Sequence, residues 1–364
     1  MIEKNKNIII VISFFLIVFG CFLGIFMMEK KMISISERRK LASKPEMSVD
    51  SILSGDFMDE AEEYLLDHFP GRDNFRSFKA EIAFHLLQKK DNEGIYLVKD
   101  GIYKLEYPLK EDQVLLGAKK LNELYDTYLT GMNVYYGVIP DKNYYVAKEQ
   151  GYLSLDYERM LSLLRDNIRH MTEIKLFDCL EAEDYYRTDL HWKQTNLTGV
   201  LERLSERMNL SLSPLSTYDQ KTLAPFYGSY YGQAALNLAP EEIIYLSNDT
   251  IEEACVYNLE KDSFMDVYTP SLESLDAYEL FLSGATAFLT IDNKNNTNGR
   301  ELIIFRDSFA SSLAPLLLEE YAKITLIDLR YMSSQLLPQL ITFEDQDVLF
   351  LYSTLVFNQS AMLR

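Results

Sequence analysis

Short apolar runs alternate with helical patterns along the C-terminal part of this 364-residue chain, and this alternation constrains the fold more than any other feature. Glu301–Phe305, Ile324–Leu329 and Val348–Tyr352 have the length and composition of buried strands, and helical patterns at Ala310–Glu320 and Ser333–Leu340 lie between them. Strands that alternate with helices at this spacing are typical of βαβ units. The sequence therefore predicts an α/β domain, in which a parallel sheet is flanked by helices.

The same character extends upstream to about residue 93. Asp100-Gly101 lies between two apolar runs and predicts a β-hairpin, because Asp-Gly favours the tight turns that join antiparallel strands. Further helices and strands are expected at Glu111–Thr130, Met132–Ile139, Asp156–His170, Glu173–Phe177, Asn196–Met208 and Ile243–Leu246. We therefore expect one α/β domain over residues 93–364.

A nearly unbroken apolar run covers Ile8–Met28. At about 1.5 Å per residue, a helix over this run reaches about 30 Å, which is the thickness of a bilayer's hydrocarbon core. No small-x-small cleavage motif follows it, so we expect an uncleaved signal-anchor, a cytoplasmic tail over residues 1–7 and a single-pass protein of the cell membrane whose bulk is extracellular. Basic residues lie on both sides of the run, so the positive-inside rule does not settle the orientation. Lipoprotein processing at Cys21 stays open as an alternative.

Residues 29–92 are expected to form a linker and a small membrane-proximal helical segment. Amphipathic patterns cover Phe57–His68 and Asp73–Gln88, and Pro70-Gly71 separates them. Since proline and glycine end helices, the two patterns predict a helical hairpin.

Composition excludes some classes of partner. A net charge of −19 argues against nucleic acid, because phosphate binding depends on clustered lysine and arginine. Hydrophobic residues make up 48% of the chain and charged residues 25%, which are ordinary values for a folded globular protein. Cys179 and Cys255 either pair or remain separate thiols, since two cysteines alone do not distinguish these states.

Two short motifs hold the groups of an acyl-transfer centre. Tyr186–Trp192 contains Asp189 and His191, and Ser308 follows the expected strand Glu301–Phe305 at the start of a helix. In an extended segment the side chains of Asp189 and His191 point to the same side, so the carboxylate can orient the imidazole. Ligands bind beyond the carboxyl ends of parallel strands, where the first helical N–H groups favour a developing oxyanion. The pattern predicts Ser308 as nucleophile, His191 as base and Asp189 as the orienting acid.

Other interpretations of these residues remain open. Asp307 or Ser308 is also a suitable helix cap, and Asp189 is also compatible with a solvated carboxylate beside a half-buried histidine. A metal site built from Asp189, His191 and Asp307 lacks the further histidine or cysteine that transition metals usually recruit. The Gly-x-Ser-x-Gly elbow and a glycine-rich phosphate loop are absent from the sequence, and no metal or cofactor is predicted.

Four residues are candidates for substrate binding. Arg306 is placed either to attract an anionic substrate or to pair with the next residue, and Trp192 is either a packing residue or a wall of the cleft. Lys142 follows a strand and is expected to line the same cleft. Tyr231 lies in a Gly-Tyr-rich segment that offers aromatic rings to a sugar.

The motifs of this chain resemble those of the DHHW protein family of Gram-positive bacteria. The resemblance rests on Phe69-Pro70-Gly71-Arg72-Asp73, Gly94-Ile95-Tyr96-Leu97 with Lys99-Asp100-Gly101, Tyr186–Trp192, Asp307-Ser308-Phe309 and Ile327–Tyr331. Leu190 replaces the first of the two histidines in the family name, and its side chain is expected to point away from Asp189 and His191. That family in turn is distantly similar to the SGNH-type alginate O-acetylation proteins AlgJ and AlgX, which carry an Asp-x-His-Trp motif ahead of a serine nucleophile.

The resemblance implies an SGNH-hydrolase-like α/β fold and a serine-dependent O-acetyltransferase or acetylesterase. The acceptor would be a cell-surface or exopolysaccharide, and a membrane-bound O-acyltransferase is the implied partner. A non-catalytic polysaccharide-binding scaffold of a surface-polymer assembly is the alternative. The distance between Ser308 and His191 distinguishes the two, because a nucleophile and its base must lie within hydrogen-bond reach, about 3 Å.

Overall fold

The chain divides into two compact units. The N-terminal unit comprises Met1–Glu93 with Tyr231–Leu238, and the α/β unit comprises Gly94–Tyr230 with Ala239–Arg364. The computed structural model describes residues 2–27, 31–34, 37–271 and 275–364. The domain boundaries expected from the sequence, at residues 7, 28 and 92, stay predictions.

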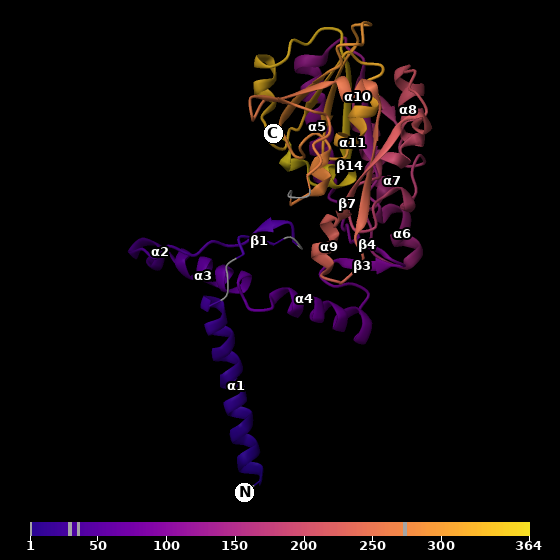
Figure 1. The fold of residues 1–364 in the computed structure, drawn as a ribbon. Helices are drawn as coiled ribbons and strands as arrows, with labels where there is room; N and C mark the ends of the chain where they lie inside the picture. The colour runs from indigo at the N-terminus through magenta and orange to yellow at the C-terminus, as the bar shows by residue number, and fades with distance from the viewer. Residues whose placement is uncertain (1, 28–30, 35–36, 272–274) are drawn as a thin grey trace. The chain divides into compact units, whose positions relative to one another are not determined.

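The N-terminal unit begins with one long helix, α1 (Ile2–Met27) (Figure 1). Within it, Lys6–Ile25 has a mean hydropathy of 3.1 and is long and apolar enough to cross a membrane. A single-pass anchor and a signal sequence both have this length and composition. The last residue of the expected span, Met28, lies outside the described residues with the start of the linker, Glu29 and Lys30.

Short helices follow in the same unit, as the amphipathic patterns predict. They are α2 (Val49–Ser54), α3 (Asp56–Asp67) and α4 (Arg72–Glu81). Helix α4 continues into a π-helical turn over Ile82–Leu86. Two short strands, β1 (Ile33–Ser34) and β2 (Arg39–Lys40), precede these helices. The break between α3 and α4 falls at Gly71, whose φ of 70° favours glycine. Arg39 donates two hydrogen bonds to the carboxylate of Asp67 and lowers the pKa of that group to about 2. This bidentate pair joins β2 to the end of α3.

An eight-stranded sheet forms the centre of the α/β unit, in the order β10-β9-β11-β13-β12-β14-β5-β6. Its strands are β5 (Val134–Ile139), β6 (Thr172–Ile174), β9 (Cys255–Asn258), β10 (Ser263–Met265), β11 (Phe288–Asp292), β12 (Glu301–Arg306), β13 (Lys323–Ile327) and β14 (Asp347–Ser353). The five strands from β13 to β6 are parallel, which confirms the predicted α/β fold with a parallel sheet.

The other three strands, β9, β10 and β11, pair antiparallel and were not expected from the sequence. A parallel pair needs a crossover of about a dozen residues or more, usually through a helix. Between β9 and β10 there are only four residues, Leu259–Asp262. Among the described residues from β10 to β11, the one helical segment is a single 3-10 turn at Ala277–Leu280. This part of the chain is therefore limited to antiparallel pairing.

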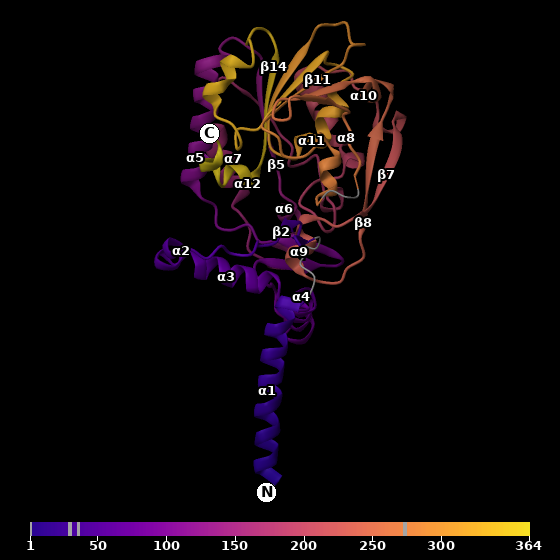
Figure 2. The same ribbon diagram turned by 60° about the vertical axis from the view of Figure 1, so that its left-hand side comes forward.

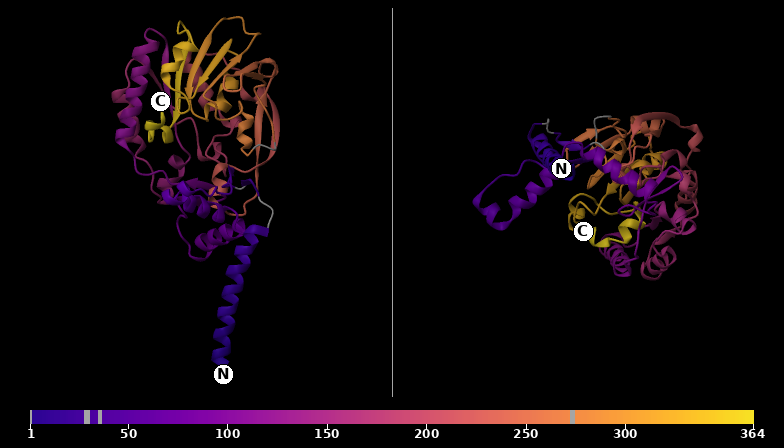
Figure 3. Two further views of the ribbon diagram at one scale, coloured as in Figure 1. Left: turned by 90° about the vertical axis from the view of Figure 1, so that its left-hand side faces the viewer. Right: turned by 90° about the horizontal axis from the view of Figure 1, so that it is seen from below.

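Helices cover both faces of the sheet (Figures 2 and 3). One face packs against α5 (Glu111–Leu124), α7 (Tyr157–Asn167) and α12 (Thr354–Phe357), and the other packs against α8 (Thr198–Met208) and α11 (Ala310–Leu313). Strand β12 shows why both faces must be covered. Ile303 and Phe305 enter one core while Leu302 and Ile304 enter the other, so the strand is apolar on both sides.

The remaining elements of the unit lie outside this sheet. They are the hairpin β3 (Ile95–Val98) and β4 (Gly101–Lys104), the ribbon β7 (Asp219–Phe226) and β8 (Glu241–Ser247), and the helices α6 (Asn143–Gln150) and α10 (Asp249–Glu253). A further helix, α9 (Ser229–Ala234), lies where the chain passes between the two units. The hairpin turns at Lys99-Asp100, next to the Asp-Gly pair from which it was predicted.

Two C-terminal helices are shorter than their patterns predict. The expected helix Ala310–Glu320 is α11, of four residues, followed by a 3-10 turn over Ala314–Leu317, and the expected helix Ser333–Leu340 is a 3-10 helix over Ser334–Gln339. Each contains a proline, Pro315 or Pro338. Proline removes a backbone donor, which ends regular α-helical bonding.

Candidate active site

The Asp-Leu-His-Trp motif forms a tight loop instead of the extended segment expected from the sequence. Tyr185 and Trp192 pair as an antiparallel bridge, and the amide of Tyr186 donates to the carbonyl of His191 at 3.0 Å. Within the loop, the amide of His191 donates to Asp189 Oδ1 at 2.9 Å. Aspartate commonly accepts from the backbone two residues ahead, and this contact turns the chain so that the two side chains meet.

Asp189 and His191 form a direct carboxylate–imidazole pair. The imidazole Nδ1–H donates to Asp189 Oδ1 at 2.6 Å. Since an ionised carboxylate only accepts, this contact places the proton on Nδ1 and leaves Nε2 as an acceptor. Both side chains are buried, so the pair is shielded from water.

Ser308 completes a series of three groups. Its Oγ lies 2.7 Å from His191 Nε2, and the hydroxyl donates to that nitrogen. The serine lies in the turn between β12 and α11, at the carboxyl edge of the parallel sheet, as predicted. Its side chain is partly exposed, whereas His191 is 5% exposed and Asp189 is completely buried. Ser308 is thus the member of the series that solvent reaches.

One of the backbone N–H groups that were expected to stabilise an oxyanion, the amide of Phe309, has a partner within the protein. The amide of Phe309, at the start of α11, donates to Asp307 Oδ1 at 3.1 Å, so this donor is already used. Asp307 Oδ2 accepts from the amide of Ser353, at the end of β14, at 2.8 Å. Asp307 therefore caps the turn and joins two strand ends, which was the alternative that its position allowed.

Two distant segments hold the Asp189 loop in place. The amide of Ser229 donates to Asp189 Oδ2 at 2.6 Å, and the amide of Tyr230 donates to the carbonyl of Thr188 at 3.0 Å. Glu241 accepts from the amides of Arg187 and Thr188 at 2.8 and 2.7 Å. Every one of these partners lies at least 40 residues away from the loop in sequence.

Gly228 permits this close approach. A Cβ at this position would lie 2.2 Å from the carbonyl oxygen of Thr188 and 2.5 Å from Asp189 Cβ. Contacts between carbon and backbone atoms do not occur at such distances, so only glycine fits here. The Gly-Tyr-rich segment of the sequence therefore supports the loop through its backbone.

Two aromatic side chains, Tyr278 and Phe309, lie against the imidazole and were not identified from the sequence as site residues. Tyr278 stacks on His191 with ring centroids 3.8 Å apart and an angle of 6° between the planes, and Phe309 lies at 4.9 Å on a tilted plane. Burial raises the pKa of Tyr278, which keeps its phenol neutral. The tyrosine hydroxyl and the indole Nε1–H of Trp192 both donate to Ser312 Oγ at 2.9 Å. No local pattern marks Tyr278, because it joins the site through tertiary contacts.

The structure separates the predicted binding residues into different environments. Arg306 is completely buried and donates to Ser311 Oγ and to the carbonyl of Thr286, so it serves the core and does not face a substrate. Trp192 is also completely buried, which makes it a packing residue and excludes it as a wall of the cleft. Tyr231 belongs to the N-terminal unit, and its role in sugar binding stays a prediction.

Lys142 follows β5 and supports the backbone of the motif. Its ammonium donates to the carbonyls of Tyr186 and Arg187 at 2.9 and 3.1 Å. The ammonium also lies over the rings of Tyr103 and Tyr230, at 4.8 and 5.1 Å from their centroids. Burial lowers the pKa of Lys142 to about 7.

The donor chemistry of the site does not suit a metal ion. Asp307 accepts two backbone N–H groups, and Asp189 accepts from the His191 ring and from backbone amides. Over the part of the chain that the structure describes, no group of three His, Cys, Asp or Glu side chains could hold a metal. Cys21, Cys179 and Cys255 are free thiols.

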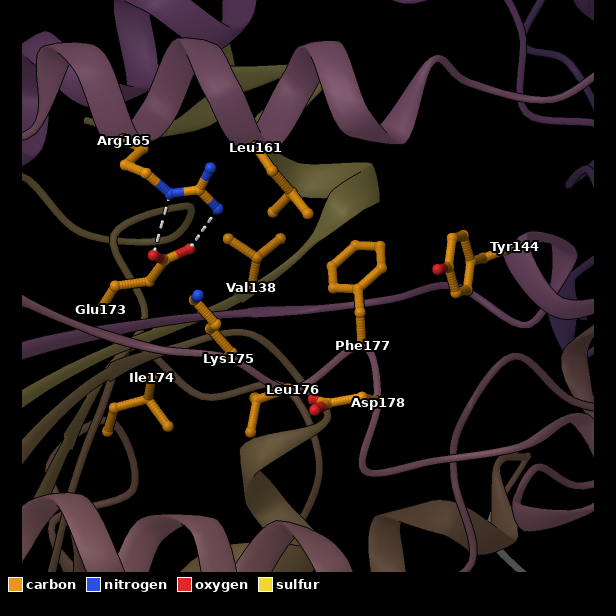
Figure 4. Close-up of a pocket in the computed structure, with 10 residues that line it drawn as sticks. All are labelled: Val138, Tyr144, Leu161, Arg165, Glu173, Ile174, Lys175, Leu176, Phe177 and Asp178. Carbon is orange, nitrogen blue, oxygen red and sulfur yellow. Dashed lines mark hydrogen bonds and ion pairs between the residues drawn. The ribbon is translucent and has the colours of Figure 1, made fainter.

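Two cavities open on the α/β unit. One, of about 320 Å³, lies between α7 and β6 and is closed on one side by the Arg165–Glu173 ion pair (Figure 4). The other, of about 500 Å³, lies against the Tyr186-Arg187 end of the motif and has Lys142 in its wall. Ser308, His191 and Asp189 are absent from the residues that line either cavity.

Known proteins share this sequence pattern and fold. Residues 158–327 match the family model described as DHHW protein. A DHHW family protein from Eubacterium siraeum is similar in structure, with a TM-score of 0.61 and 22% identity over 73% of this chain and 93% of that one. Among curated proteins, none matches this chain.

Bacillus cereus PatB1 is similar in structure at 15% identity. One structure has a TM-score of 0.58 and covers 73% of this chain and 97% of PatB1; a second, with a sulfonyl adduct, has a TM-score of 0.55 and covers 72% and 97%. The O-acetyltransferase domain of Pseudomonas putida AlgJ matches with a TM-score of 0.41 and 12% identity, over 73% of this chain and 93% of that one. At these identities the likeness establishes the fold alone. The resemblance to the DHHW protein family that the motifs predict is thus confirmed, on residues 158–327.

Proposed function

We propose that this chain is an extracytoplasmic O-acyltransferase that moves an acetyl group onto a hydroxyl of a cell-surface or exopolysaccharide. The observation that carries the proposal is the continuous series from Asp189 through His191 to Ser308, with contacts of 2.6 and 2.7 Å. A serine hydroxyl is a weak nucleophile until an adjacent base accepts its proton, and a histidine needs a second group to fix its tautomer. Both requirements are met by the described side chains.

The reaction would proceed in two half-steps. Ser308 Oγ attacks the carbonyl carbon of an acyl ester while its proton passes to His191 Nε2, and the imidazolium then protonates the leaving alkoxide. The acyl-serine is next attacked by an acceptor hydroxyl, which gives its proton to Nε2, and that proton returns to Ser308 when the ester bond to the serine breaks. Asp189 stabilises the imidazolium in both half-steps through its 2.6 Å contact with Nδ1–H.

The burial of the three groups supports this division of roles. Low-dielectric surroundings strengthen the attraction between Asp189 and a protonated His191, whereas Ser308 stays within reach of a substrate. Tyr278 and Phe309 hold the imidazole plane, so that Nε2 keeps its direction towards Ser308. A binding scaffold would have no need of this alignment, and the 2.7 Å distance between Ser308 Oγ and His191 Nε2 therefore supports catalysis over binding alone.

The partners follow from the proposed reaction. The acceptor is a polysaccharide, and a membrane-bound O-acyltransferase would supply the acyl group on the outer side of the membrane, to which α1 would anchor the chain. An acetylesterase would use the same three residues with water as acceptor. The two activities differ in the acceptor, and therefore only in an assay that offers water and sugar hydroxyls together.

Ser308→Ala tests the proposal. The full-length chain in detergent micelles is given an activated acetyl ester, such as p-nitrophenyl acetate, with oligosaccharide acceptors, and acetylated sugar and free acetate are measured separately. We expect a loss of at least about 10³-fold in Ser308→Ala and no loss in Ser334→Ala, a half-buried serine in the 3-10 helix Ser334–Gln339. Free acetate without acetylated sugar would favour the esterase.

A covalent probe gives an independent readout. PatB1 is known with a sulfonyl adduct, and sulfonyl fluorides react with activated nucleophiles. We expect a sulfonyl fluoride to label Ser308, and the label to disappear in His191→Ala. Transfer at the wild-type rate by Ser308→Ala, together with labelling at another residue, would refute the proposal.

A further inference from the structure

The cavity of about 500 Å³ beside the motif has the composition of a ligand site. Three elements enclose it: the turn of the β3–β4 hairpin, helix α6, and the segment that runs from Glu181 to Lys193. Its volume lies within the range of small-molecule sites, about 300–1,000 Å³. All of its lining residues belong to the α/β unit.

A buried ammonium with an unused donor lies in the cavity wall. Lys142 is 3% exposed and has three N–H donors, of which two are taken by the carbonyls of Tyr186 and Arg187. For the third donor, the described residues supply no hydrogen-bond acceptor, and the ammonium borders the cavity. A ligand oxygen at this position would accept a hydrogen bond from the buried ammonium.

The charges around the cavity favour a neutral ligand. Cationic and anionic side chains line it in equal number, and part of this charge is already paired, as in the 2.8 Å contact between Arg187 and Asp100. Glu149, Glu181 and Glu183 would repel a polyanion, whereas Lys99 and Lys193 would repel a cation. The lining residues thus offer both hydrogen-bond donors and acceptors.

The inner surface is aromatic and aliphatic. Tyr103, Tyr145 and Val146 contribute to it, and Tyr103 also lies under the Lys142 ammonium. A sugar ring has an apolar face of C–H groups and a rim of hydroxyls that both donate and accept. This combination matches a lining that contains both tyrosine rings and polar side chains.

We propose that this cavity is a saccharide subsite, which binds a neutral sugar unit of the acceptor through Lys142 and the tyrosine wall. The inference rests on the proposed function, because it identifies the acceptor as a neutral glycan. Lys142 also connects the subsite to the chemistry. It holds the carbonyls of Tyr186 and Arg187, and the chain continues from these residues into the loop of Asp189.

Filling the cavity tests the subsite. Ala182→Trp places an indole on a half-buried lining residue, and Ala361→Trp makes the same change at an exposed alanine that does not line the cavity. Gln150→Trp, on the exposed rim, is a second filling variant should Ala182→Trp fail to fold. Binding is measured by saturation-transfer NMR on the full-length chain in micelles, in a Ser308→Ala background, with neutral hexose and N-acetylhexosamine tetrasaccharides and a uronic acid tetrasaccharide.

We expect signals from at least one neutral tetrasaccharide and weaker signals from the uronic acid tetrasaccharide. Binding of the neutral tetrasaccharide should be at least about tenfold weaker in the filled variants but not in Ala361→Trp. In the active background the filled variants should raise KM for the acceptor by a larger factor than they change hydrolysis of p-nitrophenyl acetate. Binding that is equal in filled and control variants, or confined to the uronic acid, overturns the subsite. Because binding is read without Ser308, loss of the subsite and loss of the proposed transferase activity give separate results.

Discussion

Asp189→Asn is the substitution that tests the catalytic geometry most directly. The carboxylate accepts three hydrogen bonds, from the amide and Nδ1–H of His191 on Oδ1 and from the amide of Ser229 on Oδ2. Asparagine keeps the shape but replaces one oxygen with an NH₂ donor. With the amide nitrogen in the Oδ2 position, the N–H of Ser229 loses its acceptor; with the nitrogen in the Oδ1 position, the backbone N–H of His191 loses its acceptor.

Either orientation gives a calculable loss of stability. One buried backbone donor is left unsatisfied, so the free energy of unfolding should fall by about 1–3 kcal/mol. The loss of activity should be larger. In one orientation His191 takes the reversed tautomer, and Nε2 cannot accept the proton of Ser308; in the other, the imidazolium lacks its counter-charge. We expect kcat/KM to fall about 10³–10⁴-fold, equivalent to about 4–5 kcal/mol at 1.36 kcal/mol per decade.

Asp307→Asn is the matched control. Asp307 is also buried and also accepts two backbone amides, from Phe309 and Ser353, but its side chain makes no hydrogen bond to His191. This variant should lose a similar 1–3 kcal/mol of stability, about one unmatched donor, and retain activity within about tenfold. The measurements are denaturant unfolding and hydrolysis of p-nitrophenyl acetate. Activity of Asp189→Asn within about tenfold of the wild type, or equal losses in both variants, would refute the role of the carboxylate.

Three further substitutions test the support of the site. Gly228→Ala places a Cβ 2.2 Å from the carbonyl oxygen of Thr188. The free energy of unfolding should therefore fall by about 1–3 kcal/mol or more, and the rate of ester hydrolysis should fall with it. Wild-type behaviour in both assays would contradict the close approach. Tyr278→Phe keeps the ring that stacks on His191 at 3.8 Å, whereas Tyr278→Leu removes that ring. Because such aromatic pairs are worth about 0.5–1.5 kcal/mol, Tyr278→Leu should lower kcat/KM about two- to tenfold. Equal effects of the two changes would refute the stacking role. Burial lowers the pKa of Lys142 to about 7, whereas a lysine in the unfolded chain has a pKa of about 10.4. Between these two pH values the unfolded chain binds more protons than the folded chain. The free energy of unfolding should therefore rise from pH 7 to pH 9. Lys142→Met should flatten this rise, and an unchanged slope in denaturant unfolding would contradict the pKa.

Local patterns in the sequence predicted the parallel part of the sheet correctly. The strands β12, β13 and β14 are continuous apolar runs, because each is buried on both faces, and such runs can be recognised from a few neighbouring residues. The antiparallel strands β9 and β10 were missed. Exposed residues interrupt them, as at Phe264, and their pairing depends on which strand edge is available.

For the candidate site too, the sequence determined some features and the tertiary structure decided others. Asp189 and His191 are two residues apart, and Ser308 follows a strand end, so the sequence by itself determined which three groups can form an acyl-transfer centre. Tertiary structure alone decided how they meet. His191 and Ser308 are 117 residues apart, and the backbone of Gly228-Ser229 and the ring of Tyr278 come from other segments to orient them. Burial also decided against Arg306 and Trp192 as binding residues, because the neighbouring sequence does not show which distant segments will cover a side chain.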